Sequence, residues 1–196
     1  AVDCFGSANG EFEIDVTGYT GAYSYEVFDN LGTSITTGNG NTATNPQVIF
    51  GMQAGNYTVD ISETTSPFCT TTTNVVTIAS PATALTLAVT ETSNVTCDDD
   101  SGTITAIANG GWGTYEYELA GAATVAYSSN GTFTGLSAGA YTVNVRDAGG
   151  CIVSDTVTLI IPPAITSTIT ASTTMLSCFG DTNATITANA TAGGQG

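Results

Sequence analysis

The sequence predicts an all-β protein made of tandem antiparallel β-sandwich domains, and three observations support this prediction. The 38 threonines, together with abundant Val and Ile, carry β-branched side chains that fit a pleated sheet. Apolar and polar residues alternate in short runs that end at turns rich in Gly and Asn. The same ordered set of motifs occurs twice along the chain and begins a third time.

The repeat consists of a cysteine, a Tyr-x-Tyr strand, an Ala-Gly-x-Tyr-Thr-Val strand and a second cysteine. The matched anchors are Cys4 with Cys97, Tyr23 with Tyr115, Tyr57 with Tyr141, and Cys69 with Cys151. Their offsets fall from 93 to 82 residues, so the first copy carries an insertion, which we expect to form loops between Tyr25 and Tyr57. We therefore expect repeats at residues 1–82 and 83–163 and a truncated third repeat at 164–196.

Seven short strands are expected in the second copy, and no segment there shows helical periodicity. The strands are centred on residues 85–89, 104–106, 115–119, 125–127, 133, 141–145 and 157–159. Turns containing glycine separate them, because glycine adopts a positive φ at little cost. Seven strands at this spacing predict a sandwich of immunoglobulin-like type.

Two tyrosines follow a tight glycine turn, in the patterns Met-x-x-Gly-x-Tyr57 and Leu-x-x-Gly-x-Tyr141. In sandwich domains a tyrosine at this place forms a tyrosine corner, in which the ring is buried and the hydroxyl bonds the upstream backbone. The alternative is that Tyr57 and Tyr141 form ligand platforms. The alternation of their neighbours, which is typical of core residues, favours the corner.

These motifs together resemble the SprB repeat. The resemblance rests on Cys-x-Gly at Cys4 and Cys178, and on the runs at residues 110–117, 136–145 and 147–151. It implies a segment of a very long surface adhesin of gliding bacteria, exported by the type IX secretion pathway, in which tandem sandwiches form a stalk or filament. The first copy departs from the pattern at residues 66–69, where we expect the Asp-x-x-Gly-Cys turn to be lost.

Composition excludes several classes of function. With a single basic residue, Arg146, no Lys, no His and a formal charge of −16, the chain lacks the cationic footprint of nucleic-acid binding. It also lacks the imidazole and amine groups of common catalytic sites. Glu116 and Glu118 could form a carboxylate pair as in glycoside hydrolysis, but a solvated strand face explains them better. We therefore predict that the chain is not an enzyme.

The chain shows neither a basic and apolar leader nor an apolar run near the ~20 residues of a membrane helix. It begins at a repeat start and stops inside a third copy, so we expect a piece of a longer polypeptide with its targeting signals elsewhere. The segments 79–84 and 161–165 are short and contain Pro, which predicts limited freedom between neighbouring repeats.

The cysteines predict an oxidising, extracellular compartment. Each full copy has one cysteine before its second strand and another after its Tyr-Thr-Val strand, so we expect disulfides Cys4–Cys69 and Cys97–Cys151. Each would stabilise the fold by roughly 4 kcal/mol in the loop-entropy model, and Cys178 would pair outside this chain. Five buried thiols are the alternative. Zinc is disfavoured because the chain has no His and no chelating Cys spacing.

Two features are candidates for ligand binding. Asp98, Asp99 and Asp100 form a carboxylate run that suits calcium, a hard cation, although an acidic solvated loop is the favoured interpretation because the other copies lack it. Trp112 lies in a Gly-flanked loop and could stack on a sugar ring, although a packed loop anchor is favoured. No other cofactor is expected.

Two classes of function therefore stay open. The first is an adhesive, structural repeat of a surface fibre, whose partners are neighbouring repeats, other fibre subunits or surface glycans. The alternative is a calcium- or glycan-binding accessory module of a secreted multidomain enzyme. An adjoining catalytic domain would favour the second, and further copies of the repeat would favour the first.

Overall fold

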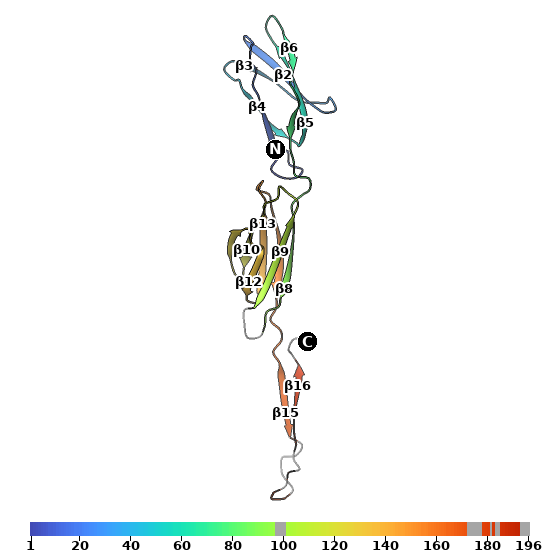
Figure 1. The fold of residues 1–196 in the computed structure, drawn as a ribbon, viewed down its shortest axis with the longest axis vertical. Coiled ribbons are helices and arrows are strands. Elements are labelled where there is room, and N and C mark those ends of the chain that lie inside the picture. Colours follow the sequence, from blue (N-terminus) through green and yellow to red (C-terminus); the bar gives the residue numbers. More distant parts are fainter. Residues whose placement is uncertain (97–100, 172–177, 181, 183–184, 193–196) are drawn as a thin grey trace. The chain divides into compact units, whose positions relative to one another are not determined.

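A computed structural model describes residues 1–96, 101–171, 178–180, 182 and 185–192. Within these residues every regular element is a β-strand, and no helix there is long and apolar enough to cross a membrane. Figure 1 traces these strands along the chain from the N-terminus to the C-terminus. The chain divides into two compact units. The first contains residues 1–87, 108–116 and 145–153, and the second contains 88–107, 117–144 and 154–196. The first unit thus combines the first sequence repeat with two segments of the second.

The first repeat forms seven strands in two antiparallel sheets. They are β1 (Gly10–Ile14), β2 (Ala22–Asp29), β3 (Ser34–Asn41), β4 (Gln47–Met52), β5 (Gly55–Glu63), β6 (Thr70–Thr72) and β7 (Val76–Ile78). Strands β1 and β4 pair with each other. The second sheet has the order β3-β2-β5-β6, and β7 also pairs with β5. The two central strands, β2 and β5, therefore supply much of the core.

Alternation along β2 and β5 places one set of side chains in that core. Val27 pairs across the sheet with Val59, and both are buried, as are Tyr23 and Ile61. The other buried members of this cluster are Val2, Ile14, Ile49, Met52, Tyr57 and Ile78. Burial of one such aliphatic side chain contributes about 1.5–3 kcal/mol, so these strands hold the first repeat together.

The insertion in the first repeat is a long hairpin and not only a loop, so that expectation was wrong in part. Strand β3 has 8 residues and pairs along β2, whereas β11 (Val125–Ser128) of the second repeat has 4. Gly38 and Gly40 lie directly under the rings of Tyr25 and Tyr23, where a Cβ atom would overlap the aromatic carbons. The glycines allow the added strand to pack closely against these tyrosines.

The second repeat contains all seven strands that the sequence predicts. They are β8 (Thr86–Ser93), β9 (Gly102–Asn109), β10 (Glu116–Gly121), β11, β12 (Thr132–Leu136), β13 (Gly139–Arg146) and β14 (Ile152–Leu159). One sheet has the order β12-β9-β8 and the other β11-β10-β13-β14. Inward-facing residues alternate along the strands, as in β13, where Tyr141, Val143 and Val145 are buried.

The third copy contributes strands β15 (Thr166–Ala171) and β16 (Ile186–Ala192), which pair antiparallel. The fold class is therefore all-β, with tandem antiparallel sandwiches of immunoglobulin-like type. The repeat boundaries at 82/83 and 163/164 stay a prediction.

Candidate functional site at the second cysteine of each repeat

The described residues contain a disulfide between Cys4 and Cys151, whose Cα atoms are 5.7 Å apart. The predicted pairs Cys4–Cys69 and Cys97–Cys151 were wrong, because Cys4 and Cys151 are bonded to each other. Cys69 carries a free, exposed thiol, and Cys97 lies outside the described residues. The physical reason is proximity, because only cysteines with close Cα atoms can bond. Residues 2–4 lie against the loop that contains Cys151.

Asp147 organises this loop in the second repeat. Its Oδ1 accepts hydrogen bonds from Gly149 N and Cys151 N at 2.9 Å each, and its Oδ2 accepts one from Trp112 N at 2.9 Å. The side chain is 5% exposed, so a carboxylate that is removed from water is satisfied by three backbone donors. Hydrogen bonds to a charged acceptor are stronger than neutral ones, and this side chain therefore fixes the loop that carries Cys151.

Trp112 contacts residues 2 and 3 through its indole nitrogen. Trp112 Nε1 donates to Val2 O at 3.1 Å and to Asp3 O at 2.6 Å, which is the geometry of a loop anchor. Gly149 lies beside this contact, and a Cβ atom there would overlap both the indole ring and the Asp3 carbonyl oxygen. The second repeat therefore holds the segment of residues 2–4 by two hydrogen bonds and one covalent bond.

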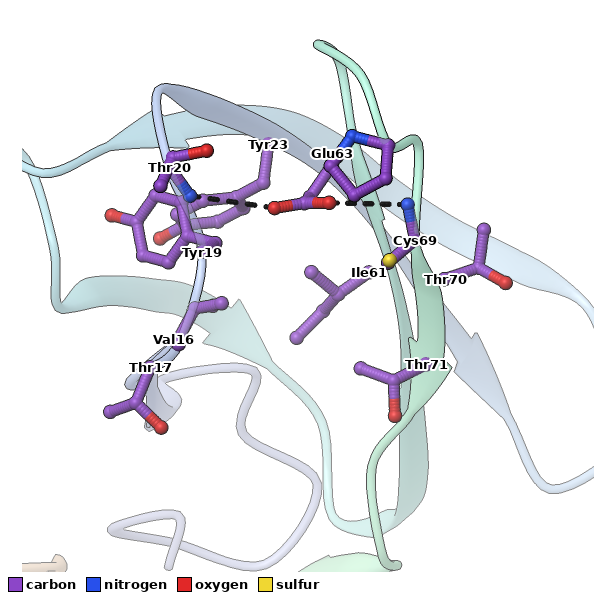
Figure 2. A pocket seen from close by; sticks show the side chains of 12 residues that line it. Val16, Thr17, Tyr19, Thr20, Tyr23, Ile61, Glu63, Cys69, Thr70 and Thr71 are labelled. Atoms are coloured by element: carbon purple, nitrogen blue, oxygen red, sulfur yellow. Dashed lines mark hydrogen bonds between the residues drawn. The ribbon is translucent and has the colours of Figure 1, made fainter.

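The first repeat contains the same hydrogen-bond scaffold, with Glu63 in the place of Asp147. Glu63 Oε1 accepts from Thr20 N at 3.4 Å and Oε2 accepts from Cys69 N at 3.2 Å, as Figure 2 shows. The backbone agrees as well, because Glu63 N donates to Cys69 O just as Asp147 N donates to Cys151 O.

The first repeat lacks the Asp-x-x-Gly-Cys sequence, as expected, but Glu63 makes the hydrogen bonds that Asp147 makes from this turn in the second repeat. The acid precedes its cysteine by six residues in the first repeat and by four in the second. The longer carboxylate side chain of Glu63 spans the wider loop. The residue before each cysteine is left-handed in both, with φ of 61° at Phe68 and 84° at Gly150, so both loops turn in the same way into the cysteine.

A pocket of about 320 Å³ opens beside Glu63 and Cys69. Its walls come from residues 16–20, from Tyr23 of β2, from Ile61 and Glu63 of β5, and from residues 67 and 69–71. Figure 2 shows Glu63 crossing between Thr20 and Cys69, with Val16, Tyr19 and Ile61 around the hollow. The pocket combines apolar walls with a cysteine thiol at its edge.

Both predicted corner tyrosines bond the backbone four residues upstream. Tyr57 Oη donates to Gln53 O at 3.0 Å, and Tyr141 Oη donates to Ser137 O at 2.9 Å. Both rings are buried. Burial, with a smaller contribution from Asp29, raises the pKa of Tyr57 above its ordinary value. These tyrosines therefore serve the fold at the glycine turns.

The remaining candidates do not form a described ligand site. Asp98, Asp99 and Asp100 lie outside the described residues, and no group of three or more His, Cys, Asp or Glu side chains elsewhere in the described chain is arranged to hold a metal ion. Glu116 forms an ion pair with Arg146 at 2.6 Å, and Glu118 accepts from Asn144 Nδ2 at 2.8 Å.

The family described as SprB repeat matches this chain at residues 2–31 and 89–124. The two matches fall in the first and second copies of the repeat, which confirms the resemblance found in the motifs. No curated protein matches the chain in sequence.

Solved structures that resemble this chain are two-domain immunoglobulin molecules. The amphioxus IgVJ-C2 molecule is 12% identical over 78% of this chain and 97% of its own, with a TM-score of 0.33. DIP-gamma IG1+IG2 is 14% identical over 79% and 90%, with a TM-score of 0.34. A chain in the crystal structure of Dpr2 Ig1-Ig2 in complex with DIP-Theta Ig1-Ig3 is 16% identical over 84% of this chain and 70% of its own, with a TM-score of 0.31. The details of the fold therefore rest on the sheet topology described above.

Proposed function

We propose that this chain is a structural and adhesive segment of a long extracellular bacterial surface protein, which serves attachment to surfaces or gliding. The observation that carries this proposal is the match of two separate regions to the SprB repeat. The partners in this role are neighbouring repeats of the same protein, and other fibre subunits or surface glycans.

The disulfide supports an extracellular location. Disulfides form and persist in oxidising compartments and are rare in the bacterial cytosol. The bond between Cys4 and Cys151 joins the first and second repeats, so it strengthens a structure made of repeats instead of closing one small domain. This use of cysteine suits a protein that stays folded outside the cell.

The side-chain chemistry supports a role without catalysis. The chain has no His and no Lys, and its single Arg is engaged with Glu116. In the described part of the chain, the buried polar and charged side chain is Asp147, which is satisfied by backbone donors. A carboxylate that accepts three backbone hydrogen bonds fixes the loop that carries Cys151, which is a structural role.

Antibody fragments raised against this chain would test the proposal on the cells that produce it. We expect the fragments to label intact cells and to reduce the number of cells that attach to glass or the speed at which they glide. Fragments against an unrelated surface protein are the control. Labelling that requires permeabilised cells would reject the extracellular location, and labelled cells with unchanged attachment and gliding would reject the adhesive role.

A further inference from the structure

The two repeats differ at one edge of the smaller sheet. This sheet has three strands in the second repeat, in the order β12-β9-β8, and two strands in the first, β1 and β4. Strand β1 is the counterpart of β9, because Gly10 and Gly102 lie 92 residues apart in the chain, as Tyr23 and Tyr115 do. Within the described residues, β1 has no neighbour in the place where β8 pairs with β9. The first repeat therefore has an open sheet edge there.

The open edge presents hydrogen-bonding groups of the backbone. Val16 N donates to Asn45 Oδ1 and Val16 O accepts from Asn45 Nδ2, both at 3.0 Å, and Asn45 lies on the side of β4. The N–H and C=O of one trans peptide unit point in opposite directions. The carbonyl group of Asp15 and the N–H of Thr17 therefore point to the open edge, where they suit a further strand.

The hollow of about 320 Å³ beside Glu63 lies next to this edge, and Val16, Thr17, Gly18 and Tyr19 line it. Figure 2 shows Thr17 and Tyr19 on one side of the hollow and Thr71 of β6 on the other. Strand β6 is the edge strand of the larger sheet. The hollow therefore lies between the segment that follows β1 and the edge of the other sheet.

In the second repeat, residues 83–85 cover the counterpart of this hollow. Gly111, the counterpart of Tyr19, donates from its backbone N to Thr83 O at 3.0 Å, and a Cβ atom on Gly110 would overlap Ala84 O. Leu85 is buried, and β8 follows directly. The chain itself thus shows what kind of segment fills this place, namely a strand that begins over the hollow and continues along the sheet edge.

Strand β8 also shows the chemistry that such an edge accepts. Every second residue is apolar and less exposed than its neighbours, namely Leu85, Leu87 and Val89. The threonines that follow contact the neighbouring strand, because Thr90 Oγ1 donates to Thr105 O and Thr92 Oγ1 donates to Thr103 O, at 3.4 Å each. A strand with apolar residues on one face and threonines on the other therefore matches this edge.

Burial of the inward residues differs between the repeats as an absent strand would require. Ile104 and Ala108 of the second repeat are 0% and 6% exposed. Their counterparts in the first repeat, Phe12 and Val16, are only half-buried. A strand beside β1 would remove more of this apolar surface from water, which is favourable.

We propose that the open edge of β1, together with the hollow, binds an additional β-strand, and that this strand comes from another repeat of the same kind and has the sequence pattern of residues 83–93. In recognition by strand addition, backbone hydrogen bonds give affinity and alternate side chains give specificity. The proposal rests on the difference between the two repeats and does not depend on an adhesive function.

The outer face of β1 determines which strands are accepted. Glu11 and Glu13 are exposed and are the counterparts of two threonines of β9. In the register of the second repeat, they would lie opposite Thr92 and Thr90 of the added strand. Opposite charges on paired strands attract each other and like charges repel. The edge should therefore accept hydroxyl or basic side chains at these two positions and reject acidic ones.

The test adds a synthetic peptide with the sequence of residues 83–93, labelled with fluorescein, to the full chain. We expect saturable binding in fluorescence anisotropy and slower hydrogen exchange at the Thr17 amide in the complex. A control peptide with Leu85→Asn, Leu87→Asn and Val89→Asn should bind at least about tenfold more weakly, because it buries less apolar surface. Equal affinity of the two peptides, or no binding of the first, would overturn the proposal.

Two variants of the chain locate the bound peptide. Thr17→Pro removes the N–H that faces the open edge, whereas Thr17→Ala removes the exposed side chain and keeps the N–H. We expect the peptide to bind Thr17→Pro about tenfold more weakly than Thr17→Ala, with circular dichroism showing that both variants are folded. Equal affinity of the two variants would overturn the proposal, because the peptide would then bind elsewhere.

A second peptide tests the register without a change in the backbone of the chain. It carries Thr90→Lys and Thr92→Lys and should bind several-fold more tightly than the unchanged peptide at low salt. This gain should disappear with a chain that carries Glu11→Gln and Glu13→Gln. A gain of the same size with that variant would come from the overall negative charge of the chain and would overturn the proposed register.

Discussion

The loop ends of the first and second repeats share one hydrogen-bond scaffold but differ in every contact that involves another segment. In the second repeat the carboxylate is buried and accepts three bonds at 2.9 Å. In the first repeat it is partly exposed and accepts two bonds, at 3.2 and 3.4 Å. The cysteine is a disulfide in the second repeat and a thiol in the first. The shorter and more numerous bonds occur where the site holds residues 2–4.

The comparison shows that two properties of the site are separate. One is the scaffold, the hydrogen bonds by which the carboxylate fixes the loop, and the other is the occupant, the segment of residues 2–4 that the second repeat holds. Glu63 maintains the loop in the first repeat without any bound segment, so the carboxylate is not there only to receive one. Trp112 and Gly149 are the additions that contact the segment in the second repeat. Substitutions can therefore test the scaffold and the occupant independently.

The largest effect is expected from the disulfide. Cys151→Ser opens a loop of 147 residues, and the loop-entropy model predicts a loss of about 5 kcal/mol in the free energy of unfolding. Urea denaturation followed by circular dichroism measures this loss. Cys69→Ser is the matched control and should change the free energy by less than about 0.5 kcal/mol. An equal loss of unfolding free energy in the two variants would contradict the difference between Cys151, which is in a disulfide, and Cys69, which is a free thiol.

The carboxylates provide the next comparison. Asp147→Ala leaves three backbone N–H groups without their acceptor in a buried site, so we expect a loss of about 3–5 kcal/mol in the free energy of unfolding. Glu63→Ala removes two longer bonds at a partly exposed site and should cost about 1 kcal/mol. Denaturant titration of both variants checks the order. A Glu63→Ala loss as large as that of Asp147→Ala would contradict the difference in burial.

Trp112→Phe tests the occupant and not the scaffold. The variant keeps an aromatic ring but loses the indole N–H that bonds Val2 O and Asp3 O, so we expect a loss of about 1 kcal/mol. It should also increase the rate at which dithiothreitol reduces the bond between Cys4 and Cys151, because residues 2–4 separate from the loop more often. Thr20→Val in the first repeat is the control. An unchanged reduction rate in Trp112→Phe would mean that the indole N–H does not help to hold residues 2–4 against the loop.

The smallest effect concerns the tyrosines of the first repeat. Burial raises the pKa of Tyr23, with further contributions from Tyr19, Tyr25 and Asp15, and burial also raises the pKa of Tyr57. The unfolded phenol loses its proton at about pH 10, before the folded one does. Stability from these groups is therefore complete below that pH and falls as the pH rises toward the folded pKa values. Tyrosinate absorbance should show late-titrating groups, and Tyr23→Phe should remove one of them while Tyr57 remains. A wild-type titration with no more late-titrating tyrosine than that of the variant would contradict this.

The strands of the second repeat were predictable because each is defined locally. Phe133 alone indicates β12, since it lies between the turn residues Asn130-Gly131 and Ala138-Gly139, and the alternation of Tyr141 with Val143 defines β13. The corner tyrosines follow from the glycine turns in the same way. The long β2–β3 hairpin was missed because the glycines at 38 and 40 weaken the alternating pattern of a strand. These glycines are needed for close packing against the rings of tyrosines in the neighbouring strand β2, which the local sequence does not show.

The disulfide could not be predicted, because spacing within one repeat carries no information about contacts between repeats. Cys4 and Cys151 are separated by 147 residues, and nothing in the motif around either favours the other over Cys69. The role of Asp147 was also missed, since Asp beside glycines is common in turns. Glu63 was an available signal. The first repeat has two more residues than the second between its tyrosine corner and its second cysteine, and Glu63 aligns with Asp147 if these two residues are placed between the acid and the cysteine.

The bond between Cys4 and Cys151 also determines which part of the chain can lengthen under tension. A pull between residue 1 and residue 163 follows the backbone to Cys4, crosses the two sulfurs and continues from Cys151, so residues 5–150 bear no force while the bond is intact. The 147-residue span between the two cysteines corresponds to a contour length of about 500 Å at ~3.3–3.6 Å per residue. That length is released only after reduction, which makes this part of the chain nearly inextensible when oxidised and highly extensible when reduced.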